Sequence, residues 1–123
     1  MNEILAALLA FNAAVIEARD VLAPHARVFV GAQVGEGTDA YAWTKCIPES
    51  EVFVVQVAEK TLLLDNVKIR FAAAHEVCHV VMHGAALCRA TKANENLPGP
   101  LSARKHEMEN EADDCAIKYL YGQ

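Results

Sequence analysis

The five residues His75-Glu76-Val77-Cys78-His79 constrain this chain more than any other segment. Their H-E-x-x-H spacing places two imidazoles one helical turn apart on the same face, with roughly 6 Å between their Cβ atoms, so both can bind one zinc ion. Glu76 lies about 100° further round the helix, where its carboxylate can take a proton from a water molecule beside the metal. The motif therefore predicts a helix with metal ligands His75 and His79 and a general base, Glu76.

A catalytic zinc site needs a third protein ligand and an open position for water. A histidine of the metzincin type is excluded, because that extended motif needs a glycine and a histidine where this chain has Met82 and Ala85. His83 continues the histidine stripe at a step of four, but two turns beyond His75 it tends to point past a shared metal. A role behind the metal ligands or in packing is the stronger interpretation of His83, although ligation stays open.

The acidic segment 107–113 is the other source of a third ligand, and it lies in a predicted helix over residues 105–121. Glu109 is the preferred ligand. Asp113 lies four residues later on the same face, where it can accept a hydrogen bond from a ligating imidazole and fix its tautomer. Glu107 and Glu111 are interpreted as solvated acidic residues favoured near a helix N-terminus.

Two segments resemble the ImmA/IrrE-type metallopeptidases. Residues 70–83 (RFAAAHEVCHVVMH) look like the R-F-x-x-A-H-E-x-x-H-x-x-x-H segment of that family, and residues 109–116 (ENEADDCA) look like its E-x-x-A-[ND]-x-F-A helix. The first Glu of the second motif is the family's third zinc ligand, which corresponds to Glu109. The chain departs from the family at Cys78, where a small residue is usual, and at Cys115, where Phe is usual. Together the segments cover about a fifth of the chain.

The resemblance implies a minimal zincin-like domain of the gluzincin type and a zinc-dependent endopeptidase acting on a protein substrate, such as a regulator or repressor. Family members are described as cleaving such proteins and are often encoded by phages or mobile elements. A metal-binding sensor or a component of a larger assembly, including a viral particle, is the alternative. A purely structural zinc domain is disfavoured, because it has no need of Glu76.

Hydrophobic periodicity predicts an α+β fold in which one helix precedes a small twisted sheet and two helices follow it. The expected helices cover residues 2–22, 67–87 and 105–121, with Asp65 or Asn66 as the N-cap of the second. The expected strands are 27–34, 41–46 and 51–58. The resemblance to the ImmA/IrrE-type family implies that 51–58 is an edge strand able to pair with an extended peptide. Residues 89–104 are expected to form a loop.

Length and composition predict a single domain over residues 1–123, because 54% hydrophobic residues can build one core but not two. A net charge of −5 with only 11 Lys and Arg disfavours direct nucleic-acid binding. The apolar stretch 4–16 is too short to span a bilayer and lacks the basic start of a signal peptide. We therefore expect cytoplasmic residence, with association with a virion as the alternative, and no membrane partner.

The four cysteines show no C-x-x-C pair, and a chain of this length can fold without disulfides, so we expect free thiols. A further hypothesis is that the Cys46 thiolate blocks the zinc in a latent form. Peptide hydrolysis also calls for a group that stabilises the oxyanion. Pattern alone does not choose among the candidates His25, Tyr41, His106, Tyr119 and Tyr121.

Overall fold

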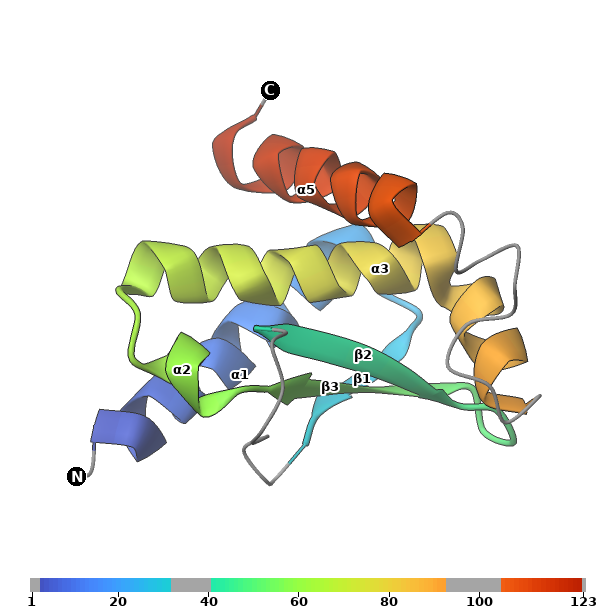
Figure 1. The fold of residues 1–123 in the computed structure, drawn as a ribbon, viewed down its shortest axis with the longest axis horizontal. Coiled ribbons are helices and arrows are strands. Elements are labelled where there is room, and N and C mark those ends of the chain that lie inside the picture. Colours follow the sequence, from blue (N-terminus) through green and yellow to red (C-terminus); the bar gives the residue numbers. More distant parts are fainter. Residues whose placement is uncertain (1–2, 32–40, 93–104, 123) are drawn as a thin grey trace.

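The computed structural model describes residues 3–31, 41–92 and 105–122. In these ranges the chain is α+β, with four helices and one three-stranded mixed sheet, as the hydrophobic pattern predicts. The helices are α1 (Glu3–Leu22), α2 (Glu59–Leu62), α3 (Asn66–Lys92) and α5 (Lys105–Tyr121), and the strands are β1 (Arg27–Val30), β2 (Ala42–Ile47) and β3 (Val52–Val57). Helix α3 lies along the sheet, and α5 lies on the side of α3 that faces away from the sheet (Figure 1).

The sheet has the order β1-β3-β2, with β1 parallel and β2 antiparallel to β3. The prediction that segment 51–58 forms an edge strand is therefore wrong, because β3 is the central strand. Its side chains alternate in burial, and Phe53, Val55 and Val57 are the buried set. The register pairs Thr44 with Val55 and Cys46 with Phe53, so these residues of β2 lie on the buried face of the sheet.

The main core lies between this face of the sheet, α1 and α3. Helix α1 buries Phe11, Val15 and Ala18. Helix α3 buries one apolar row at helical spacing, made of Ile69, Ala73, Val77 and Val80. Gly84 continues the contact with the sheet, since a Cβ added there would lie 3.1 Å from the ring of Phe53.

Helix α3 begins one residue before the predicted start and ends at Lys92, so the first residues of the expected 89–104 loop are helical. Asp65 caps it as predicted, because its Oδ1 accepts a hydrogen bond from the backbone N–H of Lys68 at 2.9 Å. The rest of that expected loop lies outside the described residues, as do residues 32–34 of the expected first strand.

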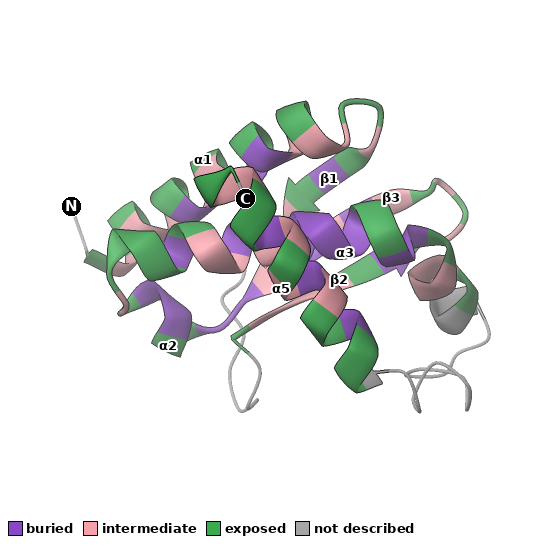
Figure 2. Ribbon diagram, turned by 90° about the horizontal axis from the view of Figure 1, so that it is seen from above, coloured by how far each residue is buried: buried purple, intermediate pink, exposed green. Residues whose placement is uncertain are grey.

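By length and composition α3 is also apolar enough to cross a membrane, over Asn66–Arg89. Core helices of soluble proteins meet the same criterion, so this observation is weak evidence that α3 crosses a membrane. Figure 2 shows the middle of α3 as a buried ribbon crossed by the more exposed α5. The position of α3 between the sheet, α1 and α5 accounts for its apolar composition.

The expectation of free cysteines is wrong, because all four form disulfides. Cys46 of β2 is bonded to Cys88 of α3, which also removes the hypothesis that a Cys46 thiolate blocks the metal site. Cys78 of α3 is bonded to Cys115 of α5. The two departures from the ImmA/IrrE pattern are therefore partners of one another. Disulfides persist mainly in oxidising compartments, so these two bonds do not favour the expected cytoplasmic residence.

Candidate metal centre

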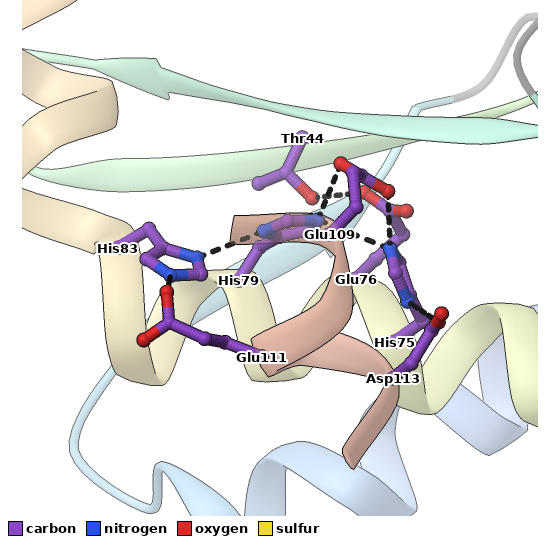
Figure 3. Close-up of polar contacts among 8 residues, drawn as sticks. All are labelled: Thr44, His75, Glu76, His79, His83, Glu109, Glu111 and Asp113. Carbon is purple, nitrogen blue, oxygen red and sulfur yellow. Dashed lines mark hydrogen bonds and ion pairs between the residues drawn. The ribbon is translucent and has the colours of Figure 1, made fainter. Parts of the chain in front are cut away.

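Three side chains from α3 and α5 converge on one point. His75 and His79 lie one turn apart on α3, and their Nε2 atoms are 3.1 Å apart. The carboxylate of Glu109 on α5 reaches both rings, with Oε2 3.0 Å from His75 Nε2 and Oε1 3.0 Å from His79 Nε2. Figure 3 shows the two rings and this carboxylate turned toward a common position.

This arrangement fits a metal ion. The candidate ligand atoms of His75, His79 and Glu109 all lie within 4.8 Å of one another. A tetrahedral zinc ion with ligand bonds near 2.0–2.1 Å needs donor atoms about 3.3 Å apart, close to the spacing found here. Two histidines and one carboxylate leave a fourth position open, which is the composition of a catalytic rather than a structural site.

The second acidic residue of the predicted pair, Asp113, lies behind His75. Its Oδ1 is 2.8 Å from His75 Nδ1. Because a carboxylate can only accept, His75 donates its Nδ1–H to Asp113, and this leaves Nε2, which also contacts Glu109, as the nitrogen available to a metal ion. The structure thus brings the predicted Glu109 and Asp113 to the same imidazole from one face of α5.

His83 does not reach the convergence point in this structure. Its ring is buried, with Nδ1 3.0 Å from His79 Nδ1 and Nε2 3.1 Å from Glu111 Oε1. His83 therefore lies behind His79, in keeping with the stronger of the two sequence interpretations. The interpretation of Glu111 as a solvated residue is wrong, because Glu111 hydrogen-bonds the buried His83.

Glu76 is almost completely buried beside the two histidines, with 4% of its surface exposed. The hydroxyl of Thr44 on β2 donates a hydrogen bond to Glu76 Oε1 at 2.8 Å. Sequence reasoning missed Thr44, because only the register of β2 against β3 places it on the face toward α3. The contact ties the edge strand β2 to the centre of the site (Figure 3).

Burial and charge shift the acid–base properties of the site. Burial raises the pKa of Glu76 above its ordinary 4.5, although the charges of His79 and His75 and the Thr44 hydrogen bond oppose the shift. The hydrogen bonds from His75 and His79 hold the pKa of Glu109 well below its ordinary range. A carboxylic acid with a raised pKa beside a carboxylate with a lowered one is the pattern expected of a proton acceptor next to a candidate metal ligand.

The pKa of His75 reflects the same two effects, burial and neighbouring charge. Burial lowers the pKa of its imidazolium, but the hydrogen bond to Glu109 and the nearby carboxylates outweigh burial and raise the pKa above 6.5. In the metal-free protein the cluster therefore favours a proton where a metal ion can be held. Metal binding at this point competes with that proton.

The five candidates for stabilising an oxyanion do not gain support from the structure. His25, Tyr41, His106 and Tyr121 are exposed. Tyr119 faces α1, where its hydroxyl donates to Glu17 at 3.5 Å.

No protein-family model matches the chain, and no curated protein or solved structure is significantly similar to it. The resemblance to ImmA/IrrE-type metallopeptidases thus rests on segments 70–83 and 109–116 alone. The site's chemistry is the stronger basis for a functional proposal.

Proposed function

We propose that this protein is a zinc-dependent endopeptidase with a minimal zincin-like fold of the gluzincin type. The observation that carries the proposal is the convergence of His75, His79 and Glu109 beside the buried carboxylate of Glu76. His75, His79 and Glu109 would hold the zinc ion. Bound zinc would polarise the peptide carbonyl and lower the pKa of the attacking water.

Glu76 acts as the general base in this proposal. Its raised pKa brings its proton affinity closer to neutrality, which suits a group that takes a proton from water and passes it to the leaving amine. The hydrogen bond from Thr44 fixes one carboxylate oxygen and leaves the other to act. Asp113 holds the ring of His75 in the ligating tautomer.

The substrate is proposed to be a protein segment in extended conformation. Strand β2 lies at an edge of the sheet next to the site, and among the described strands it pairs with β3 alone. An extended peptide can add to such an edge through main-chain hydrogen bonds, which would bring a peptide bond past Glu76. This role belongs to β2 rather than to segment 51–58.

The decisive experiment compares wild type with Glu76→Gln in two assays. We expect both proteins to contain zinc, and only wild type to cleave a mixed peptide library followed by mass spectrometry. Glu59→Gln, an exposed glutamate on α2, is the control and should cleave like wild type. Cleavage by Glu76→Gln at the wild-type rate would contradict the proposal. Zinc binding without any cleavage by wild type would instead favour a metal-binding sensor or assembly component.

A further inference from the structure

The two ligand histidines are supported in different ways. His75 contacts a carboxylate directly, through Asp113. His79 contacts another imidazole, His83, which in turn contacts the carboxylate of Glu111. Figure 3 shows this second chain running from His79 through His83 to Glu111, away from the convergence point.

The Glu111 carboxylate, at the end of this series of hydrogen bonds, sets the direction of each bond. The carboxylate of Glu111 can only accept, so His83 donates its Nε2–H. A neutral His83 then has a lone pair on Nδ1, which accepts the Nδ1–H of His79 at 3.0 Å. A metal ion in place of the proton that His79 Nε2 shares with Glu109 would then meet the Nε2 lone pair, on the atom that faces His75 and Glu109.

We propose that His83 and Glu111 are positioning residues that hold His79 in the ligating tautomer and orientation. The proposal rests on the metal-binding part of the proposed function and adds two residues to it. Helix α5 thereby supports both histidines of α3: Asp113 acts on His75 directly, and Glu111 acts on His79 through one buried ring. Such contacts behind a ligand commonly change metal affinity by about 10- to 100-fold.

The proton positions can be read in the zinc-loaded protein by long-range 1H–15N correlation of the imidazole nitrogens. We expect His79 to carry its proton on Nδ1 in wild type, and this proton to exchange faster with water in Glu111→Ala. The Nδ1–H of His75 should be unchanged in Glu111→Ala and should exchange faster in Asp113→Ala. Wild-type His79 with its proton on Nε2 would overturn the proposal.

Zinc affinity, measured by competition with a chromophoric chelator, gives a second readout. We expect Glu111→Ala to weaken binding by about tenfold or more. Asp114→Ala, at an exposed acidic residue on the same helix, is the matched control and should bind like wild type. An unchanged affinity in Glu111→Ala, with zinc bound by wild type, would overturn the relay but not the proposed function.

Because Glu111 acts on His79 through His83, the effects on zinc affinity of substituting His83 and Glu111 should be strongly coupled. His83→Phe keeps the volume of the buried ring and removes its hydrogen bonds. The double variant of His83→Phe and Glu111→Ala should bind zinc no more weakly than His83→Phe alone, because both changes break one chain. Additive losses would contradict a relay. Wild type that binds no zinc would instead sink the proposed function.

A second inference rests on a different observation, the Cys78–Cys115 disulfide. The buried contact between α3 and α5 consists of small side chains, namely Ala74, Cys78, Ala112 and Ala116. Phe71, Tyr119 and Leu120 pack against this cluster but are only partly buried, so the covalent bond reinforces a contact with few large buried side chains. Helix α5 carries Glu109, so the position of this ligand depends on that attachment.

One cysteine of this disulfide, Cys115, is partly exposed. Cys115 lines an open groove of about 620 Å³ beside the end of α1, together with Val21, Lys118 and Tyr119. Cys78 is completely buried beneath it. A thiol approaching from the groove therefore meets the sulfur of Cys115 first.

We infer that thiol–disulfide exchange at Cys115 controls metal binding. A thiolate of a dithiol reductant attacks the Cys115 sulfur and forms a mixed disulfide, while the Cys78 thiolate leaves and takes up a proton. The second thiol of the reductant then displaces Cys115 as a thiol, and the reductant becomes a disulfide. With α5 untethered, Glu109 no longer holds its place beside His75 and His79.

The other disulfide supplies a matched control. The Cys46–Cys88 bond closes a sequence separation of 42 residues and Cys78–Cys115 one of 37, so their removal should destabilise the fold to a comparable extent. We expect the Cys78→Ala/Cys115→Ala protein to bind zinc on the order of tenfold more weakly than wild type. The Cys46→Ala/Cys88→Ala protein should keep the wild-type affinity.

Hydrogen exchange keeps this test decisive if one variant folds poorly. Mild treatment of wild type with dithiothreitol, followed by iodoacetamide and peptide mass spectrometry, should label Cys115 before Cys46. Exchange protection should then fall in α5 while that of α1 is retained. Equal zinc affinities in the two double variants, or opening of Cys46–Cys88 first, would overturn the inference.

Discussion

The face of α3 toward the sheet and α1 is packed with large side chains, whereas the face toward α5 is packed with alanines and a disulfide. The first contact includes Phe11, Val15, Phe53 and Val77 in one buried cluster. The second has Ala74, Ala112 and Ala116 at its centre, with larger side chains only partly buried at its margin. Helix α3 thus has a large apolar core on one side and, on the side of α5, a thin interface with few large buried side chains.

The candidate metal site takes its residues from both α3 and α5. His75, Glu76 and His79 are carried by the helix that the large core fixes, and Glu109 is carried by the helix that the thin interface holds. The polar contacts of α5 with the histidines and the Cys78–Cys115 bond therefore matter more for Glu109 than apolar packing does. Four predictions test this contrast.

The largest effect is expected from Phe11→Ala in the large core. Phe11 is completely buried, and removing such a ring costs about 3–5 kcal/mol. Urea denaturation should show this loss, while zinc affinity measured under native conditions stays unchanged. Leu5→Ala, on the exposed side of the same helix, should change stability by less than about 0.5 kcal/mol. Equal losses in the two variants would contradict the description of this core.

Ala112→Leu, in the thin interface, should cause a smaller loss of stability than Phe11→Ala but a larger loss of zinc affinity. The side chain at residue 112 is completely buried, and an added isobutyl group there costs about 1–3 kcal/mol of overpacking. Because α5 must move to accommodate it, zinc affinity should fall more than in Phe11→Ala despite the smaller loss of stability. Ile117→Leu, on the exposed side of α5, serves as the control. Undiminished zinc affinity in Ala112→Leu would show that the position of α5 does not govern the site.

Asp65→Ala removes the cap of α3 without touching either interface. The lost hydrogen bond to the Lys68 N–H should cost about 1 kcal/mol, and Asp65→Asn should retain most of the stability. Thermal unfolding followed by circular dichroism measures both. Zinc affinity should be the same in the two variants, and a selective loss in Asp65→Ala would indicate that the start of α3 influences the ligands.

The smallest expected effect is a pH dependence in the metal-free protein. The raised pKa values of His75 and Glu76 mean that the folded state binds their protons more tightly than the unfolded state. Their contribution is complete below the ordinary values of 6.5 and 4.5 and is lost as pH rises through the raised values. Glu109 acts in the other direction, because its stabilisation is lost as pH falls below 4.5.

The free energy of unfolding without metal should therefore decline as pH rises above these ordinary values, as the linkage of the two groups requires. Saturating zinc should oppose the decline, because metal ligands must be deprotonated. Urea titrations at several pH values, with and without zinc, measure both trends. A metal-free stability that rises over this range would contradict the electrostatics of the site.

Local patterns predicted the helices well because amphipathic spacing is a property of neighbouring residues. Helix 105–121 was predicted with the bounds of α5, and the cap at Asp65 was among the two named. The order of the strands was not predictable in this way, since it depends on pairing between distant segments. The apolar run VFVV at residues 52–55 is nevertheless typical of a central strand.

The sequence predicted the site residues that are related by spacing along one helix. It did not predict the residues that reach the site through contacts between distant segments. The spacing of the histidines and of Glu109 and Asp113 is visible in the sequence. Thr44 reaches Glu76 only through the register of β2. Glu111 reaches His83 only through the way α5 crosses α3, and the same crossing joins Cys78 to Cys115.

The most direct test of the central claim is the zinc content of purified protein by elemental analysis, comparing wild type, Glu109→Gln and Glu107→Gln. We predict one zinc ion per chain in wild type and in Glu107→Gln, an exposed position on the same helix, and its loss in Glu109→Gln. Absence of zinc from wild type after incubation with the metal, or retention of zinc by Glu109→Gln, would contradict the proposed site.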